Sequence, residues 1–122
     1  MKGSCACGEI GFAVSGKARS ASICHCRQCR KMSGHAWASA QVQRPDLQIE
    51  GPVLWIALSD RARRGICPEC GSFLFWQGTG ETAISFALGA IDGPTSLTIE
   101  KHLFSDEKAD YESVSDGSPQ WV

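Results

Sequence analysis

The chain has 122 residues, of which 43% are hydrophobic and 20% are charged, and its formal net charge at pH 7 is −1. This composition is typical of a globular domain and argues against a disordered or membrane-spanning chain. The balance of 12 basic and 13 acidic residues disfavours a nucleic-acid-binding surface, which needs a basic patch.

The N-terminal stretch "MKGSCACGEIGF" has no apolar run of the length that a signal peptide needs. We therefore expect a cytoplasmic protein whose cysteines stay reduced. No run approaches the ~20 apolar residues that cross a bilayer, so no membrane partner is expected. In a reducing compartment, clustered and regularly spaced thiols indicate metal ligands or catalytic groups rather than disulfides.

Alternating apolar residues predict short strands along most of the chain. In "EIGFAVSG" (residues 9–16), Ile10, Phe12 and Val14 share one face, as in a half-buried strand. Similar runs, separated by glycine and proline turns, lie at residues 35–43, 47–50, 53–58, 72–77, 82–88 and 96–104. Strands at this spacing predict a mainly β fold, one domain over residues 1–122, made of two packed antiparallel sheets.

Helix is expected in only two places. A short helical turn is predicted after Cys26 in "RQCRKMSG" (residues 27–34). A second short helix is predicted in "SDEKADYES" (residues 105–113), where Ser105 could be the N-cap. No repeat, low-complexity tract or linker divides the chain.

The seven cysteines form three groups: Cys5 with Cys7, Cys24 with Cys26 and Cys29, and Cys67 with Cys70. In a CxC pair both side chains point the same way and can bind one ion. The CxxC pair lies in "CPECG", where Pro68 favours a turn and Gly71 can adopt the positive φ that ends it. Because tetrahedral zinc takes four sulfurs, we expect the outer two pairs to form a closed structural zinc site. The alternative is four buried free thiols that pack as small hydrophobic side chains.

The middle group, "CHCRQC" (residues 24–29), has three cysteines and no evident fourth ligand. Three thiolates can bind zinc and leave its fourth position open, which distinguishes catalytic from structural zinc. His25 is a poor ligand, because in an extended segment its ring points away from the sulfurs on either side. His35, His102 and Asp60 remain candidates for the fourth position.

Two basic clusters near the cysteines each have two interpretations. Arg27, Arg30 and Lys31 could hold cysteine sulfurs ionised or bind a substrate carboxylate, or they could be solvated surface charges. Residues 61–64, "RARR", could form the polar face of a strand or an anion-binding patch. Three tryptophans in strand-like runs are expected in the core or a cavity wall: Trp37, Trp55 and Trp76.

Four segments resemble one known family: "GSCACGEIGFAVSG", "CHCRQCRKMSG", "CPECGSFLFW" and "HLFSDEKADYESVSDGSPQW". In this order they are similar to the family of the glutathione-dependent formaldehyde-activating enzyme, which also includes centromere protein V. The resemblance covers about Gly3 to Gln120 and implies a β-tent fold of packed antiparallel sheets. It also implies a structural zinc at Cys5, Cys7, Cys67 and Cys70, and a catalytic or substrate-linked zinc at Cys24, Cys26 and Cys29.

This family is known as carbon–sulfur lyases, and its namesake joins formaldehyde and glutathione into S-hydroxymethylglutathione. We therefore predict a zinc-dependent carbon–sulfur lyase for a thiol and aldehyde adduct, with the substrate thiolate bound to zinc at Cys24, Cys26 and Cys29. His25 or His35 would carry the proton. The expected partner is a small thiol, with glutathione as the candidate. No nucleic-acid or membrane partner is expected.

The alternative function is a non-catalytic zinc-binding module for a protein partner, in which both metal ions are structural. A nucleic-acid-binding zinc ribbon is a weaker third hypothesis, because the acidic balance of the chain disfavours it.

Overall fold

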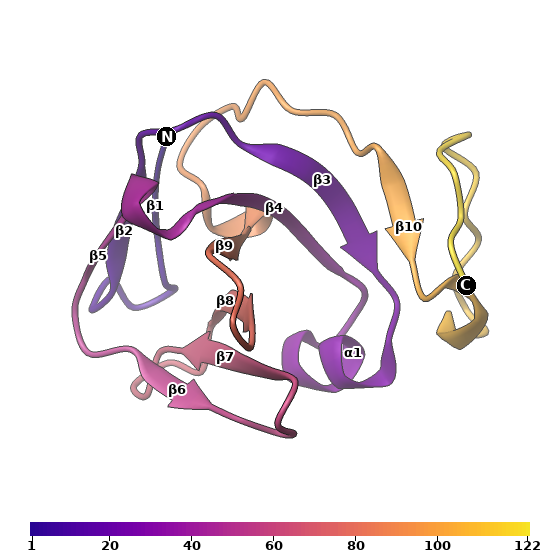
Figure 1. Cartoon of the computed structure of the whole chain (residues 1–122). Helices are drawn as coiled ribbons and strands as arrows, with labels where there is room; N and C mark the ends of the chain where they lie inside the picture. Colours follow the sequence, from indigo (N-terminus) through magenta and orange to yellow (C-terminus); the bar gives the residue numbers. More distant parts are fainter.

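The computed structural model describes all 122 residues, Met1–Val122. The strands are β1 (Lys2–Ser4), β2 (Gly11–Val14), β3 (Arg19–Cys24), β4 (Trp37–Gln43), β5 (Leu47–Glu50), β6 (Leu54–Ile56), β7 (Ala62–Ile66), β8 (Phe73–Gly78), β9 (Ala83–Ala87) and β10 (Lys101–Leu103). The helices are α1 (Arg27–Ser33) and the 3-10 turns η1 (Arg44–Asp46), η2 (Leu88–Ala90) and η3 (Ser105–Glu107). The predicted mainly β fold is confirmed (Figure 1). None of the helices has the length and hydropathy of a membrane span.

The strands form two sheets of unequal size. The smaller has the order β1-β2-β5, and the larger has the order β10-β3-β4-β9-β8-β7-β6. Neighbouring strands run antiparallel, as predicted, except that β10 lies parallel to β3. The chain before β10 follows β3, where the Glu100 amide donates to the Ala21 carbonyl at 2.8 Å (Figure 1). This crossover places β10 and the chain after it beside the CHCRQC segment, which begins at the last residue of β3.

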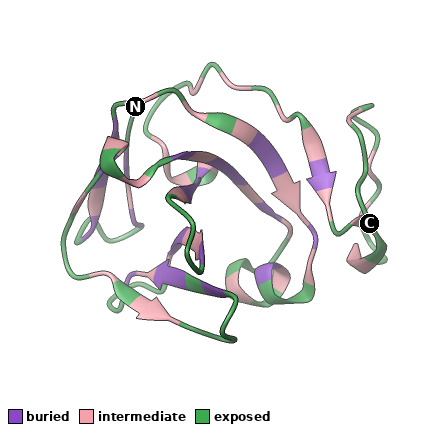
Figure 2. Cartoon of the chain, in the orientation of Figure 1, coloured by how far each residue is buried: buried purple, intermediate pink, exposed green.

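The hydrophobic core joins the two sheets. Strand β2 contributes Phe12 and Val14, with Ile10 just before it, and all three are buried, which confirms the predicted alternation (Figure 2). The Phe12 ring packs edge-on against Phe75 of β8 at 5.2 Å between ring centroids. It also lies 6.1 Å from the ring of Phe86 of β9. The small sheet is therefore held on the centre of the large sheet by aromatic side chains.

The opposite face of the large sheet is polar. On β4, Ala40 and Val42 belong to the core, whereas Ser39 and Gln41 line a cavity on the other side. Side chains along a strand alternate between the two faces, so a core on one face fixes what the other face presents. On β9, Ser85 extends the same polar face. The large sheet thus separates a hydrophobic core from a polar cavity.

The strand predictions miss β1 and β3, and one predicted run is longer than the strand that it contains. Residues 47–50 form β5 as predicted, but the run at 96–104 is a strand only over Lys101–Leu103. In β3, Ser20 has a left-handed backbone with φ of 56°, and the pairing with β4 shifts register between Arg19 and Ser22. This irregularity removes the period of two by which a strand is recognised from its sequence.

The helix predicted at residues 105–113 was wrong beyond its first turn. Only η3 is helical, and Phe104, with φ of 53°, stands at the N-cap position instead of Ser105. The following chain returns to β10, where the Trp121 amide donates to the His102 carbonyl at 2.8 Å. Pairing of the C-terminal tail with β10 therefore replaces a longer helix.

Replacing Phe86 with alanine should lower the free energy of unfolding by about 3–5 kcal/mol, because it empties a fully buried position between the sheets. Urea denaturation measures this change. Leu54→Ala is the control, because Leu54 is 46% exposed and its loss leaves no cavity in the core. Equal losses in the two variants would contradict this description of the core.

Candidate metal centres and their cavity

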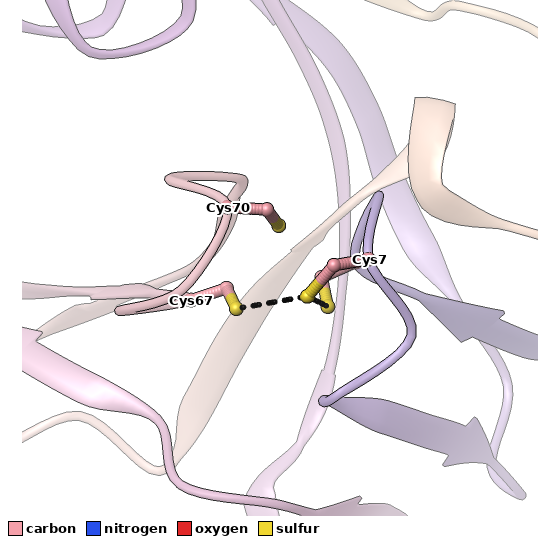
Figure 3. Close-up of side chains that lie close together, drawn as sticks. Cys7, Cys67 and Cys70 are labelled. Atoms are coloured by element: carbon pink, nitrogen blue, oxygen red, sulfur yellow. Dashed lines mark hydrogen bonds between the residues drawn. The ribbon is translucent and has the colours of Figure 1, made fainter.

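The two outer cysteine pairs meet in one cluster, as predicted. Cys5 and Cys7 lie in the turn between β1 and β2, and Cys67 and Cys70 lie in the turn between β7 and β8. The Cys7 sulfur is 3.6 Å from the Cys5 sulfur and 3.7 Å from the Cys67 sulfur (Figure 3). Four ligands at about 2.3 Å around a tetrahedral ion place sulfurs about 3.8 Å apart, whereas a disulfide needs about 2.05 Å. The spacing therefore fits a metal ion and excludes disulfides.

Backbone amides support this four-cysteine cluster. The Ile10 amide donates to the Cys5 sulfur at 3.2 Å. Burial opposes ionisation of Cys5, but this amide and the neighbouring thiols outweigh it and lower the pKa of Cys5. Gly71 has φ of 80°, as predicted, and its amide donates to the Cys67 carbonyl at 2.8 Å. The two turns are thus shaped to bring four sulfurs to a common point.

The middle cysteines form a second cluster at the end of β3. Cys24 is the last residue of β3, Cys26 is the N-cap of α1, and Cys29 lies in the first turn of α1. The three sulfurs lie within 4.8 Å of one another. The Cys26 sulfur accepts the Cys29 amide at 3.3 Å, in the role that a serine or aspartate oxygen has at other helix N-termini. The predicted helix after Cys26 therefore positions the trio.

No fourth side chain completes this trio. No further cysteine, histidine or acidic ligand atom joins the three sulfurs. Of the predicted candidates, His35 contacts the Tyr111 hydroxyl at 3.1 Å and His102 contacts His25 at 2.9 Å. Asp60 lies in the loop between β6 and β7, where its carbonyl accepts a hydrogen bond from Thr79. The trio keeps one side open to the adjacent cavity.

The three thiols of the trio share their protons unequally. Contacts with Cys24 and with Cys29 lower the pKa of Cys26 strongly, and the Cys29 amide and the charge of Arg64 act in the same direction. The contact with Cys26 raises the pKa of Cys24 to about 11, and contacts with both neighbours raise that of Cys29. One thiolate is therefore held by two thiols. A divalent ion would replace the two remaining protons.

A cavity of about 610 Å³ lies beside the trio, within the range of about 300–1,000 Å³ usual for small-molecule sites. The trio forms part of its wall, and Trp37 and Trp76 supply aromatic surface, as predicted. Hydroxyl and amide side chains of the large sheet line its polar wall: Ser20, Ser22, Ser39, Gln41 and Ser85. Four basic side chains also line it: Arg27, Arg61, Arg64 and Lys101. The cavity can hold a polar small molecule next to three sulfurs.

His25 does not line this cavity. Its ring is fully buried, and its Nε2 lies 2.9 Å from His102 Nδ1. His102 Nε2 lies 2.8 Å from Asp116 Oδ2, and this hydrogen bond lowers the pKa of Asp116. His25 Nδ1 faces Glu112 Oε2 at 3.3 Å, and Glu112 Oε1 lies 3.6 Å from His35 Nε2. All three histidines thus belong to one chain of polar contacts with the C-terminal tail.

The contacts of His102 orient the His25 ring. His102 Nε2 contacts Asp116, so Nδ1 is the ring nitrogen left to share a hydrogen bond with His25 Nε2. His25 Nδ1 is directed at the Glu112 carboxylate on the other side of the ring. Burial lowers the pKa of His25, in agreement with a neutral imidazole. The His25 ring is therefore held by His102 and Glu112, on the side of the cysteine loop away from the cavity.

Comparison with known protein families decides what this arrangement belongs to. The model of the family described as "Glutathione-dependent formaldehyde-activating enzyme" matches residues 1–107. The chain belongs to this family. The matched residues include both cysteine clusters and all ten strands, β1 to β10. Glu112 and Asp116 lie in the tail beyond the match.

A crystal structure of a Rhodobacter sphaeroides protein has the same fold, with a TM-score of 0.61. The two sequences are 20% identical, and the alignment covers 100% of each chain. Comparison with curated proteins gives no match.

Sequence reasoning missed the serine row of the cavity and the two tail carboxylates. Ser22 and Ser85 are nearly fully buried, at 5% and 4% exposed, yet they line the cavity. Small polar residues at alternate positions of otherwise apolar strands were the available signal. The contacts of Glu112 and Asp116 had no local signal, because residues distant in the sequence make them.

We expect Cys67→Ser to lose one bound metal ion per chain and to unfold at a clearly lower urea concentration. Structural zinc sites in small peptides contribute about 10–16 kcal/mol of apparent binding free energy near neutral pH. Elemental analysis and urea denaturation measure the two effects. Cys26→Ser is the matched control, because it should also lose one ion but keep the joined turns and nearly normal stability. Equal destabilisation by both variants would contradict the separate roles of the clusters.

His102→Asn should lower the free energy of unfolding by about 1–3 kcal/mol, because it removes the partner of His25 in a buried contact. Hydrogen exchange should become faster in the tail, residues 108–122. His35→Asn is the control: that side chain is 55% exposed, so a change within about 0.5 kcal/mol is expected. A tail that exchanges at the wild-type rate in His102→Asn would contradict the anchoring role.

Proposed function

We propose that this protein is a zinc-dependent carbon–sulfur lyase that makes or cleaves the adduct of a small thiol with formaldehyde or a related aldehyde. The observation that supports it most is the open trio, three sulfurs in the wall of a cavity with no fourth protein ligand. Closed four-ligand sites are typical of structural zinc, whereas three protein ligands are typical of catalytic zinc. Membership of the formaldehyde-activating family supports the choice of thiol and aldehyde.

The donor sets fit zinc at both clusters. Thiolate sulfur is a soft ligand that zinc accepts well, and the spacing of the four-cysteine cluster agrees with tetrahedral coordination. We assign Cys5, Cys7, Cys67 and Cys70 to a structural ion that joins two turns from distant parts of the chain. The trio would hold the second ion, which when bound supplies a Lewis-acid position where the thiolate of a substrate can be held and polarised.

The cavity residues bind and orient the substrate in this proposal. Trp37 and Trp76 exclude water from one side of the bound molecule, and Ser39 and Ser85 offer hydrogen bonds to its polar groups. Holding thiol and aldehyde together in this way turns a bimolecular step into an effectively unimolecular one. Glutathione is the candidate thiol, because the family name specifies it.

The reaction balances without a redox partner. In the forming direction, the thiol first gives its proton to water, the thiolate lone pair then attacks the aldehyde carbon, the carbonyl π electrons move to oxygen, and this oxygen takes a proton back from water. Cleavage is the reverse, with loss of the hydroxyl proton and breakage of the carbon–sulfur bond. Neither His25 nor His35 lines the cavity, so we assign His25 to positioning of the cysteine loop rather than to proton transfer at the reacting atoms.

The proposal is tested with Cys26→Ser. This variant should lose nearly all turnover of glutathione with formaldehyde, because two sulfurs cannot hold the ion as three do. Nuclear magnetic resonance of the S-hydroxymethyl adduct follows the reaction, and circular dichroism checks the fold. Full activity in a folded Cys26→Ser variant would refute the assignment.

A cobalt titration separates this proposal from the non-catalytic module. Glutathione or 2-mercaptoethanol should change the absorption of cobalt bound at the trio, because an added thiolate changes its ligand set. The four-cysteine cluster should not respond. If no thiol changes the absorption of cobalt bound at the trio, the site is closed, and the non-catalytic zinc-binding module is favoured.

A further inference from the structure

Arg64 is a buried cation without a counter-ion. Its side chain lines the cavity, yet the residue is only 4% exposed and its Nε has no hydrogen-bond partner. None of the three ion pairs of the chain includes it. Burying a charge is unfavourable unless it is paired, and a guanidinium offers five N–H donors. The position therefore suits an anion that comes from outside the protein.

The register of the large sheet places Arg64 on the cavity face. Arg64 pairs with Trp76, which pairs with Ser85, which in turn pairs with Gln41. All four side chains line the cavity. Adjacent Arg63 points to the other side, where its guanidinium lies 4.0 Å from the Trp55 ring and bonds Gln77. Two neighbouring arginines thus have opposite surroundings, and only Arg64 lacks partners.

The charges around the cavity favour an anionic ligand. Arg27, Arg61 and Lys101 line it together with Arg64, although the whole chain is slightly acidic. The single acidic residue in the lining is Glu107, and its carboxylate already accepts the Arg27 amide at 3.1 Å. This excess of positive charge lies in a wall shared with the cysteine trio.

Arg64 is close to the trio without being bound to it. Arg64 and the three cysteines line the same cavity, but the Arg64 side chain makes no hydrogen bond to any of the three sulfurs. Its donors therefore remain free while its charge acts near the sulfurs. A ligand that binds the trio and Arg64 at the same time would be a short molecule with a thiol and an anionic group.

We infer that Arg64 is the specificity-determining residue that binds a carboxylate of the substrate while the sulfur of the same molecule lies at the trio. The thiol half of this inference rests on the proposed function, and the carboxylate half rests on Arg64 itself. Planar guanidinium and carboxylate groups pair through two parallel hydrogen bonds, which fixes orientation as well as charge. The substrate class is then a small thiol with a carboxylate, and neutral thiols bind weakly.

The test compares 3-mercaptopropionate with 3-mercaptopropionamide, which differ only in the carboxylate. Each is titrated into cobalt-loaded protein, and the change of the trio spectrum gives its dissociation constant. In the wild type the acid should bind more tightly than the amide. Arg64→Gln should reduce this preference about 10- to 100-fold, the loss expected for a charge-assisted pair.

Arg63→Gln is the matched control, because it removes the same charge from the same strand on the opposite face. It should keep the wild-type preference. Arg64→Lys should keep part of it, because a charge remains without the paired donors, and this variant also serves if Arg64→Gln does not fold. Once the thiols are seen to change the cobalt spectrum, a preference that is absent in the wild type, unchanged in Arg64→Gln, or equally lost in Arg63→Gln would overturn the inference.

A second probe separates this inference from the proposed function. The thioether 3-(methylthio)propionate has the carboxylate but no thiolate, and calorimetry follows its binding. It should bind the wild type and Arg63→Gln and should bind Arg64→Gln about 10-fold or more weakly. Binding without this dependence on Arg64 would overturn the inference. If no thiol perturbs cobalt but the thioether binds through Arg64, the proposed function fails and the anion site stands.

Discussion

Alternation along the strands of the seven-stranded sheet is the constraint on which the rest of this structure depends. One face must cover the three-stranded sheet, so Ala40, Val42 and Phe86 point inward. The residues between them then have no choice of side, and they place hydroxyl, amide and guanidinium groups on the other face. A slip of one residue in register would bury Arg64 in the core and move a core residue into the cavity. The same hydrophobic packing that stabilises the fold therefore builds the site.

The two cysteine clusters differ in how they relate to this sheet. The four-cysteine cluster joins the β1–β2 turn to the β7–β8 turn, and amides of both turns support it. Its four sulfurs are a complete tetrahedral ligand set for one ion. The trio stands at the end of β3, with one sulfur fixed as a helix cap and the others beside it. The trio has no fourth protein ligand, and its three cysteines line the adjoining cavity.

The polar chain behind the trio explains how a short loop can keep three sulfurs in place. His25 stands between two of the cysteines, and alternation turns its ring away from them, as expected from the sequence. The ring reaches His102 on β10, and the tail supplies Asp116 and Glu112. Buried polar groups that find partners favour one arrangement of the chain around them. Glu112 and Asp116, which lie beyond the family match, thus contact the buried histidines His25 and His102.

Much of this could be predicted from the sequence, because the relevant interactions are local. The spacing of a CxC pair, the turn chemistry of "CPECG" and the period of two in "EIGFAVSG" each act over a few residues, so they identified the cysteine groups and the β fold. Strand β3 escaped prediction where the left-handed Ser20 broke that period. The tail escaped because its backbone bonds to His102 replaced a helix that its own residues favoured.

The sequence by itself determined the ligand types, their grouping and the fold class. Only the tertiary structure decided that no fourth ligand reaches the trio and that Arg64 rather than Arg63 faces the cavity. It also decided that the three histidines are linked by one series of polar contacts. These outcomes depend on sheet register and on the parallel placement of β10 beside β3. Register and crossover arise from the packing of the whole core, and no short stretch of residues contains that information.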